Sequence, residues 1–530
     1  MEKKWWTLLV VCAATFMLLI DVSIVIVALP AIQSGLHASF SDVQWVIDAY
    51  SLTLASVLLT AGSLADRYGR RLLFTIGLII FTLGSLLCGV AQSSTMLIVS
   101  RSAQGIGGAI LFATSLALLA QSFHGRERGT AFGIWGAVTG VAVGLGPVLG
   151  GLITSELSWR FIFLVNLPIG VAAVLVTLWQ VDESKTPQAA APDWAGFATL
   201  TAGLVSLVYG LIRAGEIAWS DPGVIICLAL AVVFLAVFVA VERRADHPLF
   251  DLSLFRIPTF SGGLAAAFAM NGSLYAVLVY LVIYLQDDLG YSALGTGLRL
   301  LLMSGVTLVV ATAAGRLSSR MPARWLIGPG LLLVGVGLLV MTGLNGSSSW
   351  THLIPGLILA GAGGGMVNPP LASTAVGVVT PQRSGMASGV NTTFRQIGIA
   401  TGIAVYGSIF ASSLQSKLGQ ALAGTPDLHG HLAPVVAAVQ QGNPGSAIDS
   451  VPPSLRAPLV AAIQSSFAGT LDVLLVVSGV LALAGAICGV ALIRPRDMVA
   501  SAPQAQATPA SAEPMAADYT VRLSDQERHR

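Results

Sequence analysis

Long apolar runs recur along the whole chain, and they constrain its fold more than any other feature. The 530-residue sequence contains fourteen runs of 18 or more mostly apolar residues. About 20 residues rising ~1.5 Å each span the ~30 Å hydrocarbon core of a bilayer, and a helix satisfies its own backbone hydrogen bonds there. We therefore predict an all-α membrane protein. The predicted membrane helices cover residues 5–28, 45–64, 72–92, 96–121, 130–153, 161–181, 195–213, 222–241, 260–285, 293–315, 326–343, 352–377, 387–410 and 470–493.

The composition agrees with a lipid environment and excludes several classes of function. Hydrophobic residues make up 55% of the chain and charged residues only 10%, against about 25% charged residues in soluble domains. A net charge of +2 and the lack of a basic stripe indicate that nucleic acid is not a partner. The cysteines fall inside apolar runs without metal-ligand spacing, so we expect neither a metal site nor a disulfide. They are Cys12, Cys88, Cys227 and Cys488.

The distribution of lysine and arginine predicts the orientation of the helices. If both termini lie in the cytoplasm, most of the 27 basic residues fall in cytoplasmic segments, as the positive-inside rule requires. The N-terminal Met-Glu-Lys-Lys-Trp-Trp leads into about 24 apolar residues, too many for a signal peptide, so we expect an uncleaved first helix. Arginine outnumbers lysine and alanine is abundant, which indicates a GC-rich bacterial genome. We therefore predict a multi-pass protein of the bacterial plasma (inner) membrane.

Two weak internal repeats indicate a duplicated six-helix unit. Residues 62–67 have an echo at 315–320, and residues 128–133 have one at 383–389, at about the same offset. Two six-helix halves leave two extra helices between them. The predicted parts are an N-terminal half at 1–181, the extra helices with their flanks at 182–259, a C-terminal half at 260–493 with a long outside loop at 411–467, and a disordered cytoplasmic tail at 494–530. Within the outside loop, we expect partial helix near 454–467.

A ten-residue loop between the second and third predicted helices carries the most specific motif. Residues 62–71 read Gly-Ser-Leu-Ala-Asp-Arg-Tyr-Gly-Arg-Arg. This loop resembles the G-x-L-A-D-R-x-G-R-R motif of the major facilitator superfamily, and every fixed residue of the motif is present. The resemblance implies two halves around a central cavity that rock to give alternating access. It also implies a cytoplasmic gate, whereas the alternative is a charged turn that only orients two helices. The gate residues are Asp66, Arg67, Arg70 and Arg71.

Two acidic residues lie within predicted membrane helices. Asp21 lies about two-thirds along the first helix, where a charge costs ~2.5–3.5 kcal/mol and desolvation favours the protonated acid. Residues 21–30 resemble the first-helix motif of the fourteen-helix drug:proton antiporters, with Ile26 in place of the usual Asn, as in the QacA-like branch. That branch also carries an acid at the place of Asp48, in the outer part of the second helix. Both acids are therefore candidate proton-coupling residues. The alternatives are a structural hydrogen bond for Asp21 and an interfacial helix start for Asp48.

Arg101 is a cation within the fourth predicted helix, and it shares one helix face with Gln104 and Gly108. In the antiporter family this arginine belongs to a motif that is tied to proton transfer, so the resemblance implies a proton-coupling role. The alternative is a permanent ion pair that holds the cytoplasmic gate, with Asp66 as its partner.

The fifth predicted helix is rich in glycine. Small residues allow helix backbones to approach closely, and Pro147 permits a bend. The sequence around this proline resembles the G-x-x-x-G-P-x-x-G-G motif of antiporters in the superfamily, which favours export over uptake. The residues of this antiporter motif are Gly140, Gly144, Gly146, Pro147, Gly150 and Gly151.

Polar residues in the second half are candidates for the substrate cavity. Asn391 and Arg395 form an i, i+4 pair followed by Gln396, similar to an N-x-x-R-Q-x-G element of the fourteen-helix members. Asn271 and Tyr275 lie on the ninth predicted helix, where an aromatic ring can stack on a flat or cationic drug. Neutral residues stand where QacA-like proteins carry further acids, which argues against a dicationic substrate.

The sequence contains no ATP-binding loop and no catalytic constellation, so we expect a transporter driven by the proton gradient and not an enzyme. We expect a monomer without a cofactor, which exports small amphiphilic drugs in exchange for protons. Two alternatives remain open. One is proton-linked uptake of a small metabolite, and the other is a receptor on the same fold that does not transport.

Overall fold

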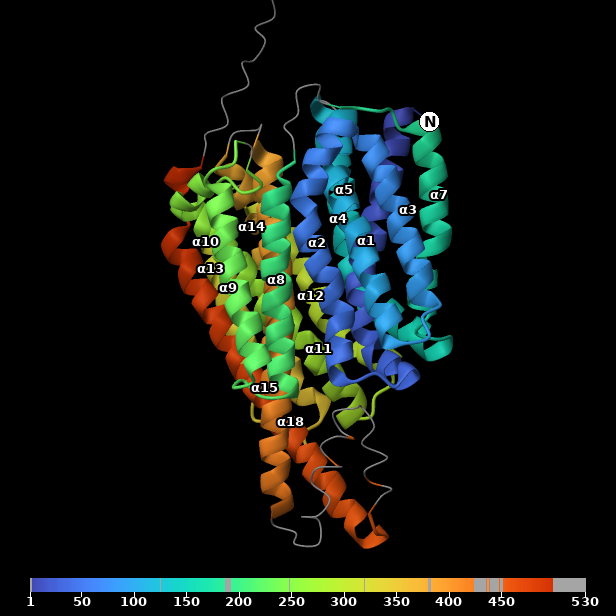
Figure 1. The fold of residues 1–530 in the computed structure, drawn as a ribbon, viewed down its shortest axis with the longest axis vertical. Coiled ribbons are helices and arrows are strands. Elements are labelled where there is room, and N and C mark those ends of the chain that lie inside the picture. The colour runs from blue at the N-terminus through green and yellow to red at the C-terminus, as the bar shows by residue number, and fades with distance from the viewer. Residues whose placement is uncertain are drawn as a thin grey trace, which may run out of the picture. The chain divides into compact units, whose positions relative to one another are not determined.

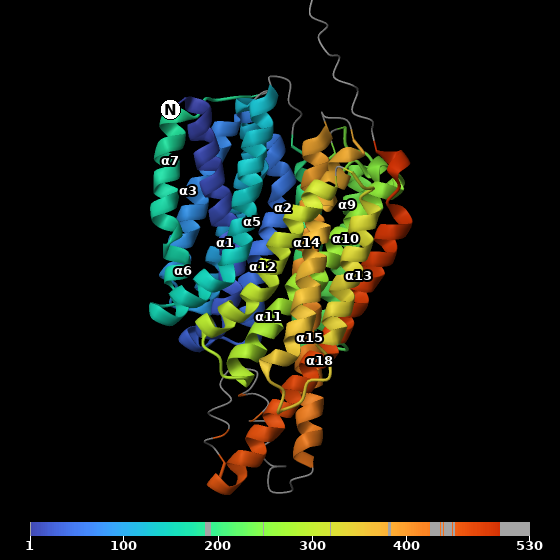
Figure 2. The ribbon, with the colours of Figure 1, turned by 180° about the vertical axis from the view of Figure 1, so that it is seen from behind.

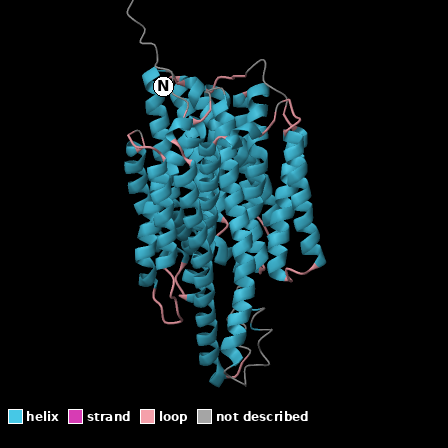
Figure 3. Cartoon of the chain, turned by 90° about the vertical axis from the view of Figure 1, so that its left-hand side faces the viewer, coloured by secondary structure: helices cyan, strands magenta, loops and turns pink. Residues whose placement is uncertain are grey.

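The computed structural model describes residues 2–498, apart from residues 124, 186–191, 247, 319 and 380–382 and most of 424–450. The secondary structure of this part is helical throughout, with no strand (Figure 3). The helices run side by side (Figure 1). We call the end of the bundle at which the first helix begins the proximal end, and the opposite end the distal end. The predicted all-α membrane fold is confirmed.

The helices follow the predicted apolar runs in order. Those before residue 182 are α1 (Lys3–Leu36), α2 (Phe40–Tyr68), α3 (Arg70–Gly89), α4 (Ser94–Ser122), α5 (Gly125–Glu156), α6 (Phe161–Leu164) and α7 (Asn166–Gln180). Two more follow, α8 (Trp194–Glu216) and α9 (Pro222–Glu242). The last group is η1 (Leu252–Arg256), α10 (Pro258–Met270), η2 (Asn271–Tyr275), α11 (Ala276–Ile283), η3 (Tyr284–Asp288), α12 (Ala293–Leu317), α13 (Arg324–Val340), η4 (Trp350–Leu353), α14 (Ile354–Gly377), α15 (Ser384–Ala423), α18 (Pro453–Leu492) and η7 (Pro495–Asp497).

The number of membrane spans depends on two helices. Twelve helices of the described part are long and apolar enough to cross a membrane. Helix α5 bends by 43° between Thr130–Ala142 and Gly144–Glu156, and counting it as one span gives thirteen. Helix α13 is apolar but has only 17 residues. The count of fourteen therefore stays a prediction, although every predicted run contains a helix.

Local chemistry explains where several helices begin and bend. Ser39 and Asp42 form a capping box at the start of α2. Gly69, with a φ of 128°, separates α2 from α3 in a conformation that favours glycine. The predicted run 260–285 is interrupted by two π-helical turns, η2 and η3, and such turns occur often at functional sites.

Two seams join the halves of the bundle, one between α5 and α12 and the other between α2 and α15. Figure 2 shows the first seam from behind. At its distal end, the Leu294 N–H donates to Ser155 Oγ at 3.0 Å. Further along, the Ser304 hydroxyl donates to the Gly144 carbonyl at 3.1 Å. At the proximal end, by contrast, a Cβ added to Gly136 would meet no atom within 4 Å.

The second seam is closed from Gln44 to Leu59 of α2. Gln44 donates to the Ile403 carbonyl of α15 at 3.2 Å near the distal end. Thr393 donates to the Ala55 carbonyl at 3.2 Å further along, and Gly389 lies against Leu59 nearer the proximal end.

Helix α8 covers the closed seam, because it packs on both α2 and α15 (Figure 1). One apolar cluster contains buried side chains from all three helices, which excludes water and lipid from the line between them. Its members include Leu52 and Leu59 of α2, Leu204, Val208 and Leu211 of α8, and Val390 and Ala404 of α15.

Helices α15 and α18 continue past the distal ends of their neighbours (Figures 1 and 2). Each has 40 residues, or about 60 Å at 1.5 Å per residue. Apolar residues spaced as on one helix face, among them Leu418 and Leu422, pack against Leu459 and Ile463 in a separate cluster. The expected loop at 411–467 is therefore helical at both ends, and this cluster is the reason.

The chain after the last long helix returns to the proximal end of α10. Thr259 donates to Asp497 through its hydroxyl at 2.7 Å and through its backbone N–H at 3.2 Å. Residues 494–498 are therefore ordered, which corrects the expectation of a disordered tail for this stretch. Residues 499–530 lie outside the described part.

The contact between Thr259 and Asp497 predicts a pH-dependent release of residues 494–498. The Thr259 hydroxyl bond is the main cause that lowers the pKa of the Asp497 carboxyl. A lowered folded-state pKa stabilises docking above the unfolded value of about 3.9, and this contribution is lost as the pH falls through the folded pKa. A fluorophore attached through M498C should gain mobility severalfold below pH 4. In D497N it should be mobile at every pH, and a mobility independent of pH in the parent would contradict the prediction.

Candidate functional site

Asp21 and Arg101 form a fully buried ion pair inside the N-terminal group of helices. Arg101 Nη1 lies 2.5 Å from Asp21 Oδ2, and the two side chains are 1% and 0% exposed. Gln104, one turn along α4, donates to Asp21 Oδ1 at 2.8 Å and accepts from Arg101 Nη1 at 2.6 Å. The i, i+3 spacing on α4 thus brings both side chains to the one carboxylate on α1.

Further groups from three other helices hold this network. Ser85 of α3 accepts from Gln104 at 2.8 Å and from Asn166 of α7 at 3.3 Å. Arg101 Nε donates to the Val46 carbonyl of α2 at 3.1 Å, and its guanidinium lies 4.2 Å from the centre of the Tyr50 ring. All of these groups belong to α1–α7. Breaking the pair would leave a buried charge uncompensated, which costs about 3–5 kcal/mol.

The predicted alternative partner of Arg101 is wrong. Asp66 contacts Arg70 at 2.9 Å on the proximal surface, whereas Arg101 binds Asp21. The structure therefore places the ion pair of Arg101 within the bundle and not at the predicted gate.

Asp48 is also fully buried, but it has no donor. Neither of its carboxylate oxygens accepts a hydrogen bond among the described residues. One helical turn away, Gln44 donates to the Tyr280 hydroxyl of α11 at 3.0 Å, and Tyr280 donates to the Ile403 carbonyl at 2.7 Å. A buried carboxylate without donors pays the full desolvation cost of its charge. Asp48 is thus a buried carboxylate without a donor among the described residues, next to the contact between the halves.

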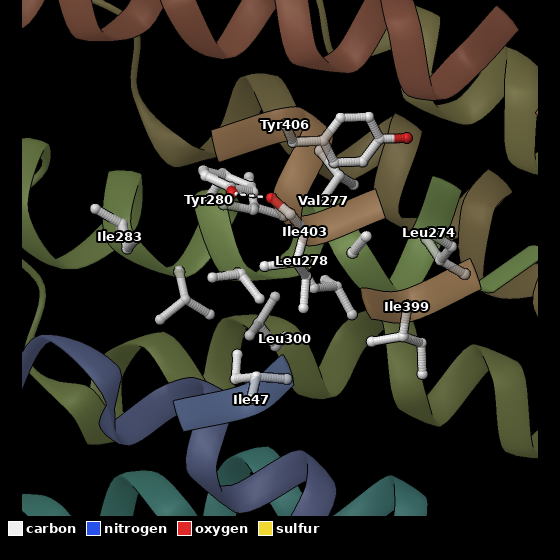
Figure 4. Packing of buried hydrophobic residues seen from close by; sticks show 14 of the residues in the cluster. Ile47, Leu274, Val277, Leu278, Tyr280, Ile283, Leu300, Ile399, Ile403 and Tyr406 are labelled. Atoms are coloured by element: carbon white, nitrogen blue, oxygen red, sulfur yellow. Dashed lines mark hydrogen bonds between the residues drawn. The ribbon is translucent and has the colours of Figure 1, made fainter. Parts of the chain in front are cut away.

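The apolar side chains around this contact come from both halves. Figure 4 shows Ile47 of α2 beside Leu300 of α12 and Leu278 of α11, with the hydrogen bond between Tyr280 and Ile403 above them. All five residues are buried in one cluster or in its rim. Asp48 follows Ile47 directly, so any change in the packing of the halves alters the surroundings of Asp48.

The predicted gate residues contact their own half. Arg70 binds Asp66, and the Arg71 side chain donates to the Leu178 carbonyl of α7. Glu183 accepts from the backbone N–H groups of Arg71 and Leu72 at 3.0 Å each, where it caps the start of α3. Arg67 is exposed and lies over its neighbour Tyr68. Among the described contacts of this loop, none reaches the C-terminal half.

The antiporter-motif glycines of α5 allow close contact with two helices. A Cβ added to Gly146 or Gly150 would collide with α1, at Ser23 or at the Ile24 backbone. A Cβ added to Gly151 would lie 2.7 Å from Leu294 Cα at the start of α12. Gly140 of α5 faces Leu308 of α12. Pro147 lies in the packed distal part of α5, where its carbonyl faces Gly297, whereas a Cβ on Gly144 would meet nothing within 4 Å.

Three of the predicted substrate-cavity residues make hydrogen bonds within the C-terminal half, and for the other two only their exposure is described. Arg395 donates to the Asn391 amide oxygen and to the Asn368 amide oxygen of α14, at 3.1 Å each. Asn271 is buried and donates to the Ala267 carbonyl of its own helix. Tyr275 and Gln396 are partly exposed.

Sequence reasoning missed four residues of these networks. Gln44, Ser85 and Glu183 resemble ordinary helix or loop residues in sequence. Asn368 carried a signal, since it is an amide within an apolar run followed by two prolines.

Comparisons with known proteins agree with this architecture. Residues 11–403 match the family model described as Major Facilitator Superfamily. This chain belongs to the major facilitator superfamily. It is 38% identical to the multidrug resistance protein Stp of Mycobacterium tuberculosis, over 78% of this chain and 77% of that protein. It is 34% identical to the puromycin resistance protein pur8 of Streptomyces alboniger, over 82% of this chain and 89% of that protein.

Solved structures of the superfamily share the fold. A bacterial homologue of the human lysosomal transporter Spinster, in an inward-facing and unoccupied conformation, matches with a TM-score of 0.61. Its sequence is 17% identical, and the match covers 94% of this chain and 99% of that chain. The predicted major facilitator fold is thereby confirmed. The chain is a multi-pass transporter and not an enzyme.

Proposed function

We propose that this protein exports small amphiphilic drugs across the bacterial plasma membrane in exchange for protons. The similar proteins named above are described as multidrug and puromycin resistance proteins, which supports drug export. The distribution of basic residues supports a cytoplasmic location for the proximal end and both termini. In that orientation the distal end, where the two halves are in contact, faces the outside. We also infer that the protein functions as a monomer.

The observation that carries the proton coupling is the pair of buried acids in unlike surroundings. Asp21 has a donor on each oxygen and a cationic partner, whereas Asp48 has neither among the described residues. The carboxylate of Asp21 is thus paired with a cation, whereas that of Asp48 is buried without compensation, so the two acids are suited to different steps of a proton-coupled cycle. When the halves rock, the contacts of Gln44 and Tyr280 beside Asp48 break, and water from outside reaches this acid.

The remaining motifs fit roles in the same cycle. The charges at Asp66, Arg67, Arg70 and Arg71 close the cytoplasmic side after the halves tilt, and the α5 glycines let α5 move against α1 and α12. The driving force is adequate, since the membrane potential supplies about 2.3 kcal/mol per charge per 100 mV.

Purified protein in sealed vesicles tests this proposal. With an imposed pH difference, a lipophilic dye should be transported against its gradient, and protons should move in the opposite direction at the same time. Adding an uncoupler should abolish accumulation of the dye without unfolding the protein. Equal transport rates before and after the pH difference and voltage are collapsed would contradict proton coupling. Proton movement in the same direction as the dye would support uptake by symport instead.

A further inference from the structure

The guanidinium of Arg395 is a cation without an anionic partner. The described residues place no carboxylate within ion-pair distance of it, and its two hydrogen bonds go to the neutral amide oxygens of Asn368 and Asn391. Arginine keeps its charge in proteins and has five N–H donors. The donors beyond these two bonds have no acceptor among the described residues. A charge held in this way requires an anion or water to complete it.

Arg395 is also positioned to meet a substrate. It lies eleven residues after the start of α15 at Ser384, or ~16 Å along the helix at 1.5 Å per residue, which is near the middle of a membrane span. The Asp21–Arg101 pair and Asp48 are at most 1% exposed, whereas Arg395 and Asn368 are partly exposed. Arg395 is therefore more accessible to a molecule within the bundle than the buried charges of the N-terminal half are.

The neighbours of Arg395 hold its guanidinium between α14 and α15. Asn368 lies on α14 and Asn391 on α15, and both amide groups turn their oxygens towards the guanidinium. Tyr275 belongs to η2, which packs on α15. Two residues before Arg395, Thr393 binds the Ala55 carbonyl across the seam to α2. Helix α15 thus has neighbours in both halves at this depth.

We propose that Arg395, fixed by Asn368 and Asn391, binds an acidic group of the cargo, such as a carboxylate or a phenolate. A guanidinium binds a planar acid through two parallel N–H···O bonds. The cargo is then an amphiphilic acid, whose ring system contacts Tyr275 and the surrounding apolar side chains. This inference rests on the proposed export function, and it narrows the substrate class to molecules with an acidic oxygen.

Two xanthene dyes of opposite charge, fluorescein and rhodamine 123, test the proposal. Binding to purified protein in lipid nanodiscs is measured by fluorescence anisotropy, and transport is measured in vesicles. In R395Q the affinity for fluorescein should fall by roughly 10- to 100-fold, the effect of a charge-assisted hydrogen bond. The affinity for rhodamine 123 should be unchanged or higher, since no charge-assisted bond to it is lost and a like charge is removed. R395K, which keeps the charge but loses the bidentate geometry, should fall between the two.

N368D provides a second test that keeps the arginine. It places a carboxylate at the position of an amide oxygen 3.1 Å from the guanidinium, so it should pair with Arg395 and exclude fluorescein while the fold is retained. Equal losses for both dyes, or an unchanged affinity for fluorescein in both variants, would overturn the proposal. If wild type binds fluorescein but does not transport it, the export function fails, whereas the binding comparison still decides the role of Arg395.

Discussion

Replacing Asp21 by Asn should abolish proton-driven efflux and also destabilise the fold. The substitution removes the only carboxylate partner of the buried Arg101 among the described residues, and an uncompensated buried charge costs about 3–5 kcal/mol. A host that expresses D21N should therefore be as drug-sensitive as a host without the protein. The susceptibility panel should be accompanied by the amount of folded protein in the membrane, since loss of fold alone also gives sensitivity.

The double variant D21N/R101Q separates the two effects. It removes both charges, and replacing a buried ion pair by neutral groups is often nearly neutral for stability. We expect D21N/R101Q to be present at close to the wild-type level and to unfold at a higher temperature than D21N. It should still lack coupled transport. Full resistance and proton-coupled efflux in either variant would refute the role of Asp21 as a proton carrier.

Replacing Gly151 by Val should hold the distal ends of the halves apart. A Cβ at this position would lie 2.7 Å from the Leu294 Cα, so two backbones must separate. Overpacking of this kind costs about 1–3 kcal/mol, which corresponds to a shift of roughly 5- to 150-fold in a two-state equilibrium. G151V should favour the conformation that is open at the distal end, and transport should slow by more than about tenfold because closure becomes costly.

Labelling of an introduced cysteine measures this shift. Ser304 is buried and donates to the Gly144 carbonyl across the α5/α12 seam, so S304C in a background without the four native cysteines reports distal opening. A membrane-impermeant maleimide added from outside should label S304C faster in G151V. The control is G136A on the same helix, because a Cβ there meets no atom within 4 Å. Unchanged labelling in G151V would show that the α5/α12 contact does not control opening.

The order of the helices followed from the sequence because apolar length is a strong local signal. Every predicted run contains a helix, and the loop at 62–71 was sufficient to indicate the superfamily. The ends of helices were less predictable. Residues 411–423 and 453–467 carry too much polar sequence to resemble membrane spans, and their helices depend on Leu418, Leu422 and Leu459 packing together. That packing arises from tertiary contact, which an apolar run does not encode.

The candidate site was predictable only as a set of separate residues. Asp21, Asp48 and Arg101 were evident because each charge is costly in lipid. Their pairing was not, since Asp21 and Arg101 are 80 positions apart and Asp66 was an equally reasonable partner on charge alone. Neutral side chains such as Gln44 and Asn368 carry a smaller cost, so their signal in the sequence is weaker or absent. Their partners lie 236 and 27 positions away, which the sequence does not reveal.

Helix α8 has a consequence for how oily compounds dissolved in the inner leaflet approach the protein. On the flank where α8 lies across α2 and α15, the apolar cluster forms a continuous wall. On the opposite flank, near the proximal ends of α5 and α12, a Cβ added to Gly133, Gly136 or Gly315 would meet no atom within 4 Å. With the proximal end in the cytoplasm, as proposed above, we expect a compound that diffuses sideways through lipid to enter on this flank and not across the wall at α8. An inhibitor wedged between α5 and α12 would obstruct that route without competing at Arg395.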